Sequence, residues 1–87
     1  MNEIQERERN HHLKILPEYY VAVLSGKKNF ELRRDDRDYC VGDTVTLHEW
    51  DKEREDYTGR YTSFRIKYVL RNCPEYGLMD GYCIFGF

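Results

Sequence analysis

The chain has 87 residues and a formal net charge of −2, with 34% charged and 40% hydrophobic residues. This length allows one small domain, which buries only about 60–65% of the surface that its unfolded chain exposes. Because the overall charge is slightly acidic, the composition excludes a protein that holds nucleic acid through general positive charge. Any such binding must come from a local basic patch.

Residues 1–11 are mostly polar, and we expect them to form a flexible N-terminal tail before a single domain over residues 12–87. The start lacks the apolar stretch of a signal peptide, and no apolar run approaches the roughly 20 residues of a membrane span. The three cysteines are odd in number and lack paired-ligand spacing, which favours reduced thiols over disulfides or zinc. We therefore expect a cytoplasmic protein with no membrane partner, no metal and no cofactor.

The first half of the domain predicts a strand, a helix and a second strand. Residues 12–15 alternate polar and apolar side chains, as a short strand does. Pro17 suits a first helical turn and Gly26 suits the position after a helix, so residues 17–25 predict a short amphipathic helix. Residues 28–34 predict a half-buried strand with Phe30 and Leu32 on its apolar face. Its charged face would carry Asn29, Glu31 and Arg33.

The second half predicts strands only. Residues 44–50 form the clearest strand, residues 51–60 a charged hairpin loop with Gly59 in its tight turn, and residues 61–70 a long strand. The apolar face of the long strand would carry Phe64, Ile66, Tyr68 and Leu70. After a loop over residues 72–81, an apolar strand ends the chain at residues 82–87. The fold class is α+β, mainly β, with about five strands closing into a small barrel that removes exposed edges.

The segment Ser25–Arg33 carries the chemistry. Lys28 stands at the start of a strand, and Glu31 and Arg33 share one of its faces. A lysine and an arginine that converge suit a phosphate or a base edge, and Glu31 could orient either cation. Spacing alone favours a different interpretation of this trio, a solvated face with weak ion pairs.

The order of these segments resembles the ASCH-type, PUA-like superfamily, and in particular the small phage and bacterial family DUF3850. The signature G-x-K-x-x-[E/T]-x-R falls on Gly26, Lys28, Glu31 and Arg33, and a Val-Gly-Asp turn stands at residues 41–43. The resemblance runs from His12 to the last strand. It implies a PUA-like β-barrel capped by the short helix, with an RNA-binding cleft between the helix 17–25 and the strand 28–34.

The resemblance also raises the possibility of catalysis. Some small ASCH proteins hydrolyse N4-acetylcytidine with a lysine, a threonine nucleophile and a glutamate. Lys28 would be that lysine, but Glu31 occupies the threonine position, and no helix carrying the glutamate is found here. If the protein is an enzyme, Lys28 and Glu31 would be its catalytic residues.

Four further residues are candidates for contacts with a ligand. His12 could line the cleft or lie on the surface, and Tyr19 lies off the apolar stripe of the helix and could face the cleft. Arg37 could form a turn network with Asp35 and Asp36 or add a phosphate contact. Trp50 beside the hairpin could stack on bases or close the barrel end.

Three functions remain open from the sequence. The first is an RNA- or nucleotide-binding module, the second a small hydrolase acting on a modified nucleoside or RNA, and the third a phage-type protein-interaction domain. We expect a monomer.

Overall fold

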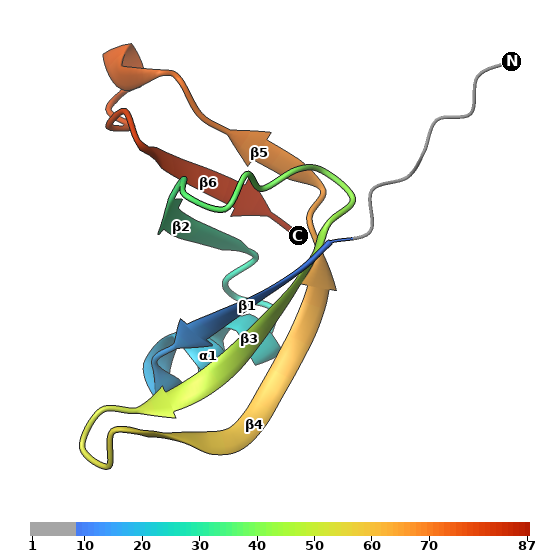
Figure 1. Cartoon of the computed structure of the whole chain (residues 1–87), viewed down its shortest axis with the longest axis vertical. Helices are drawn as coiled ribbons and strands as arrows, with labels where there is room; N and C mark the ends of the chain where they lie inside the picture. The colour runs from blue at the N-terminus through green and yellow to red at the C-terminus, as the bar shows by residue number, and fades with distance from the viewer. Residues whose placement is uncertain (1–8) are drawn as a thin grey trace, which may run out of the picture.

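The computed structural model describes residues 9–87, which form two three-stranded sheets and one α-helix (Figure 1). The first sheet has the order β1 (Asn10–Ile15), β3 (Thr44–Asp51) and β4 (Asp56–Arg65), with β1 parallel to β3 and β4 antiparallel to it. The second has the order β2 (Phe30–Arg34), β6 (Tyr82–Gly86) and β5 (Tyr68–Leu70), all antiparallel neighbours. The helix α1 spans Pro17–Leu24, and a 3-10 turn spans Pro74–Tyr76.

The mainly β character predicted from the sequence is confirmed, but the strands do not pair into a closed barrel. No strand pair within residues 9–87 joins the two sheets. Arginine side chains from outside the first sheet bond to it: Arg33 of β2 donates through Nη2 to the carbonyl of Lys14 at 2.7 Å, and Arg37, in the loop after β2, donates through Nη1 to that of His12 at 3.2 Å. Both carbonyls belong to β1, an edge strand whose unpaired backbone groups need partners.

The helix ends where the sequence predicts. Ser25 caps α1, and Gly26 follows in the left-handed region with φ +78°. The Gly26 N–H donates to the carbonyl of Val23 at 3.1 Å, and the Lys27 N–H donates to that of Ala22 at 3.0 Å. These two hydrogen bonds are the pattern of a Schellman motif. This turn reverses the chain and leads it directly into β2.

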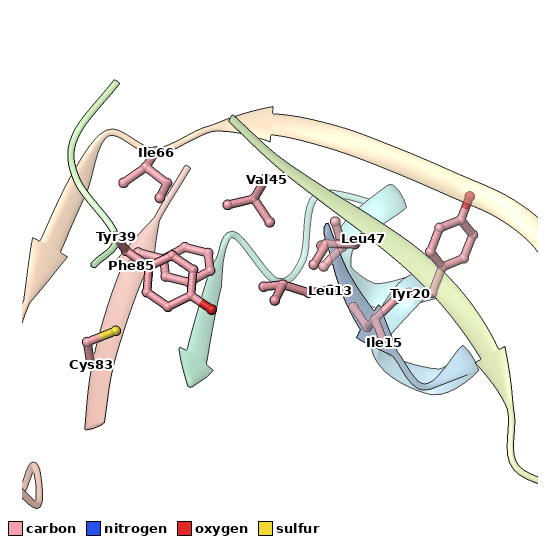
Figure 2. Packing of buried hydrophobic residues seen from close by; sticks show 10 residues of the cluster. Leu13, Ile15, Tyr20, Tyr39, Val45, Leu47, Ile66, Cys83 and Phe85 are labelled. Carbon is pink, nitrogen blue, oxygen red and sulfur yellow. The ribbon is translucent and has the colours of Figure 1, made fainter. Parts of the chain in front are cut away.

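The core lies between the two sheets and under the helix (Figure 2). Leu13, Ile15 and Leu47 come from the first sheet and pack near Tyr20 of α1, while Phe85 comes from the second sheet. Val45 lies between these groups, and Tyr39 packs against Phe85 with 4.8 Å between ring centroids and the ring planes tilted by 42°. Burial raises the pKa of the Cys83 thiol to about 11 at the far end of this core.

The long strand predicted at residues 61–70 is two strands in different sheets. The first is β4, which ends at Arg65, and the second is β5, which begins at Tyr68. Between them Ile66 is buried and bonds to the 42–43 turn, whereas the Lys67 N–H donates to Gly86 of the second sheet at 2.8 Å. The apolar alternation continues through this crossing, so Tyr68 and Leu70 come out exposed rather than buried.

Other segment boundaries differ as well: β2 begins at Phe30 rather than at residue 28, and α1 ends at Leu24 rather than at residue 25. β1 begins at Asn10, inside the segment expected to be tail, and residues 1–8 of that tail lie outside the described residues. β4 begins at Asp56, so the hairpin turn covers residues 52–55 and Gly59 lies within the strand. Among residues 9–87, no helix has the length and apolar character needed to cross a bilayer.

Replacing Gly26 with alanine is expected to lower the free energy of unfolding by about 1 kcal/mol. The cost comes from the positive φ, because nothing lies within 4 Å of the added Cβ. Urea unfolding followed by circular dichroism measures it. Gly86→Ala is the matched control, since Gly86 is not at a positive φ and its Cβ would make an ordinary 3.8 Å contact. Equal losses in the two variants would contradict the proposed strain.

Candidate functional site

A hollow of about 480 Å³ opens between α1 and β2, where the Gly26 turn joins them. Its walls come from the end of β1, from α1 and from β2. They comprise Lys14, Ile15, Leu16, Tyr19, Lys28, Phe30, Leu32 and Arg33. The hollow therefore combines three cationic side chains with apolar and aromatic walls, the usual composition of a small-molecule site.

Glu31 lies beneath the hollow, and only 4% of it is exposed. Its Oε2 forms an ion pair with Lys28 Nζ, and its Oε1 accepts from Arg33 Nε at 2.9 Å. Arg33 Nη2 lies 2.8 Å from the same Oε1. Lys28 Nζ also donates to the carbonyl of Phe30 at 2.7 Å. One buried carboxylate thus fixes both cations at the edge of the hollow.

This arrangement corrects the predicted orientation of the strand. Glu31 faces the interior, while Phe30 and Leu32 face outward, with Leu32 57% exposed. The alternation of β2 is as predicted, but its two faces are exchanged. Burial of Glu31 is tolerated because two cations neutralise and hydrogen-bond it.

The hollow carries net positive charge. Lys14, Lys28 and Arg33 line it, and among residues 9–87 Glu31 is the one acid in direct contact with two of them. Arg33 uses Nε and Nη2 for its contacts, so within residues 9–87 its Nη1 donors make no hydrogen bond. An anion in the hollow would meet these donors and the Lys14 ammonium.

Two aromatic rings stand beside Lys28. Its Nζ lies 5.6 Å from the ring centroid of Tyr19 and 5.1 Å from that of Phe30. Tyr19, which the sequence placed off the apolar stripe of the helix, does line the hollow. The two rings offer flat apolar surface next to a positive charge.

Arg37 lies outside the hollow. It lines a smaller cavity of about 160 Å³ together with Leu13, Arg33, Arg34, Asp36 and Tyr39. Arg33 belongs to both spaces, so the two are neighbours. The hydrogen bond from Arg37 to the carbonyl of His12 ties this arginine to β1, a contact that the sequence did not indicate.

The structure separates the two neighbouring histidines. His12 does not line the hollow; it is exposed on the other face of the first sheet, with its Nδ1 2.9 Å from His48 Nε2. His11, which the sequence assigned to the tail, is buried, with its Nε2 2.9 Å from Asp43 Oδ2. Only the position of Asp43 in the Val-Gly-Asp turn hinted at this pair.

A further buried acid, Glu49, was not singled out from the sequence. Glu49 of β3 is 2% exposed and receives two hydrogen bonds from Arg60, at 2.8 and 2.7 Å, and one from Thr58 at 2.7 Å. The bonds from Arg60 and then Thr58 lower the pKa of Glu49. This cluster joins β3 to β4 away from the hollow, and no local pattern relates residues 49 and 60.

Within the part of the chain that the structure describes, no group of three or more histidine, cysteine, aspartate or glutamate side chains is placed to hold a metal ion. The three cysteines, Cys40, Cys73 and Cys83, are all free thiols.

These features define a small, mainly β domain with a hollow lined by cations at a helix–turn–strand junction. The family model described as "Domain of unknown function (DUF3850)" matches residues 10–87, so the chain belongs to the DUF3850 family, and that part of the resemblance is confirmed. The chain is also similar to a protein of Escherichia phage P2 described as "Uncharacterized 12.9 kDa protein in GpA 3'region". The two are 45% identical over 56 residues, which cover 64% of this chain and 50% of the phage protein. The matched part thus spans half the length of that relative.

We expect Glu31→Gln to lower the free energy of unfolding by about 2 kcal/mol, because it leaves Lys28 and Arg33 adjacent without a neutralising charge. Chemical denaturation at neutral pH measures the loss. Adding Lys28→Met to Glu31→Gln should recover part of it, since one of the two like charges is then gone. Glu53→Gln on the exposed hairpin turn is the control. A Glu31→Gln variant as stable as the control would contradict the role given to Glu31.

The pKa of Glu49 is lower in the folded protein than in the unfolded chain, so its contribution to stability is complete above the unfolded pKa of about 4.3. That contribution is lost as pH falls through the folded pKa. We therefore expect Glu49→Gln to be clearly less stable than the parent at pH 7, with the difference shrinking as pH falls below about 4.3. Thermal unfolding across a pH series measures this. A difference independent of pH would contradict it.

Proposed function

We propose that this domain is an RNA- or nucleotide-binding module whose ligand occupies the hollow between α1 and β2. The observation that carries the proposal is the buried Glu31, which holds Lys28 and Arg33 at the edge of a hollow with aromatic walls. Fixing two cations in advance lowers the cost of ordering them when an anion binds.

The contacts of the hollow suit the two parts of a nucleotide. A phosphate would bind Lys14, Lys28 and Arg33, because arginine presents a planar fork and lysine a point charge. A base would stack on Tyr19 or Phe30, which are both exposed at the wall.

The G-x-K-x-x-E-x-R spacing supports a relation to the ASCH, PUA-like superfamily. Gly26 makes the turn, and the three charged residues of the spacing meet under the hollow. We infer that the two sheets correspond to a PUA-like barrel whose halves are linked here by Arg33 rather than by a strand pair. We propose in addition that the protein binds RNA in the cytoplasm, as a monomer, and that it is phage-related.

Binding is favoured over hydrolysis by the state of Glu31. Both of its oxygens already accept from cations, so a role as general base on a nucleoside would require one of these contacts to break. Lys28 and Glu31 remain the residues on which a hydrolase would depend.

A protein-interaction role is the second candidate, because one face of the second sheet is apolar and exposed. Phe30 and Leu32 of β2 lie on this face with Tyr68 and Leu70 of β5. Exposed apolar patches of this kind often mark contact surfaces. A partner bound there would stay bound after nuclease treatment, which separates this function from RNA binding.

Lys28→Ala is expected to weaken binding of a fluorescent mixed-sequence RNA about tenfold and to reduce the salt dependence of its Kd by about one ion. Fluorescence anisotropy across a salt series measures both. Lys27→Ala is the matched control, since Lys27 is the adjacent exposed lysine and does not line the hollow.

Unfolding curves for each variant separate lost contacts from lost folding. RNA binding that is equal in the two lysine variants would contradict the assignment of the hollow. So would an absence of binding to RNA or to a mononucleotide by the parent protein at low salt.

A further inference from the structure

The first sheet has one covered and one open face. α1 lies behind β1 and β3 in Figure 1 and packs its Tyr20 and Val23 into the core on that side. The strand register brings the alternate residues of β1, β3 and β4 together on the opposite side. The outward aromatic and basic side chains there, called the platform below, are His12, Lys14, His48, Trp50, Tyr57 and Tyr61.

The platform is a continuous chain of ring contacts. Lys14 Nζ lies 3.8 Å from the ring centroid of Trp50, which meets Tyr57 edge-on at 4.9 Å. His48 lies 5.8 Å from Tyr57 and 5.6 Å from Tyr61, measured between ring centroids. The hydrogen bond between His12 and His48 extends the chain onto β1. These side chains hold one another in place, so they form a preorganised surface.

The platform is open to solvent and positively biased. Tyr61 is 63% exposed, and Tyr57 and Lys14 are also exposed. The outward positions of the three strands from Asn10 to Lys14, Thr44 to Trp50 and Tyr57 to Arg65 carry Lys14 and Arg65 but no carboxylate. The whole chain has a net charge of −2, so the absence of acids from these positions is a local property.

An irregularity in β4 keeps the tyrosines outward. His48 pairs with Tyr61 and Trp50 with Tyr57, so Thr58, Gly59 and Arg60 stand opposite the single Glu49. Gly59 takes φ +96°, which the bulge requires. Thr58 and Arg60 then bond to Glu49 on the inner side. The buried acid thereby fixes the spacing of the two exposed tyrosines.

We propose that the platform stacks the unpaired bases of single-stranded RNA, extending the ligand site of the hollow across the open face of the first sheet. This rests on the proposed function. Lys14 links the two surfaces because it lines the hollow and also contacts Trp50. Base stacking needs aromatic faces beside cations, and only unpaired bases expose their faces, so a duplex would not fit this surface.

The test compares two probes, uridine monophosphate and an oligouridylate of about eight nucleotides. Tyr61→Ala is expected to weaken binding of the oligonucleotide roughly tenfold. Its affinity for the mononucleotide should be unchanged, because the mononucleotide contacts only the hollow. Tyr76→Ala is the matched control, since Tyr76 is 85% exposed in the 3-10 turn after β5. Tyr57→Ala serves as a second variant, and unfolding curves check that each one folds.

Trp50 supplies a direct readout, because the chain contains one tryptophan. The oligonucleotide should quench its fluorescence with the same midpoint as binding, and a duplex of equal length should bind more weakly. Unchanged oligonucleotide affinity in both tyrosine variants, or equal affinity for the duplex, would overturn the platform. If Lys28→Ala loses mononucleotide binding while the tyrosine variants behave as the parent, ligand binding in the hollow is supported and base stacking on the platform is refuted. If Lys28→Ala binds both probes normally but the tyrosine variants bind the oligonucleotide weakly, base stacking on the platform is supported and the site in the hollow is refuted.

Discussion

Glu31 is a buried acid, and a buried carboxylate must be neutralised and hydrogen-bonded by its neighbours. It draws Lys28 from the helix–strand turn and Arg33 from its own strand. Arg33 in turn reaches the carbonyl of Lys14 on the edge of β1, which connects the second sheet to the first. The hollow, its positive lining and the junction of the two sheets thus depend on the same few hydrogen bonds.

The local parts of this arrangement could be predicted from the sequence, because the residues that form them are close along the chain. Proline at the helix start and glycine after its end gave the limits of α1 to within one residue, and Lys28, Glu31 and Arg33 are close enough along the chain to meet. The alternation of β2 was also readable. Which of its two faces is buried was not, because hydrophobicity favours Phe30 and Leu32 inside when the neutralisation of Glu31 is not known.

The long-range parts could not be predicted for a different reason. Arg33 bonds to the carbonyl of residue 14, and Arg60 bonds to residue 49 across a bulge; a backbone acceptor or an irregular pairing leaves no periodic signal. The crossing at Ile66 was hidden in the same way, since the apolar alternation passes unbroken from one sheet into the other. A barrel was the simplest closure for these strands, but no strand pair of the described residues joins the sheets, and the side chain of Arg33 bonds from one sheet to the other instead.

The register of the strands sets the order in which the molecule can assemble. β3 and β4 are neighbours along the chain and can form early, whereas β1 must wait for β3, with Asn10 opposite Thr44. β2 pairs last, because its partner β6 lies farthest away along the chain, with Phe30 opposite Gly86. Closing such wide loops is slow, since the entropy of closure is lost before the contacts form. The wall of the hollow is therefore completed last. In a nascent chain, Lys28 and Glu31 would stay exposed to solvent until residues 82–86 have left the ribosome and can pair with β2.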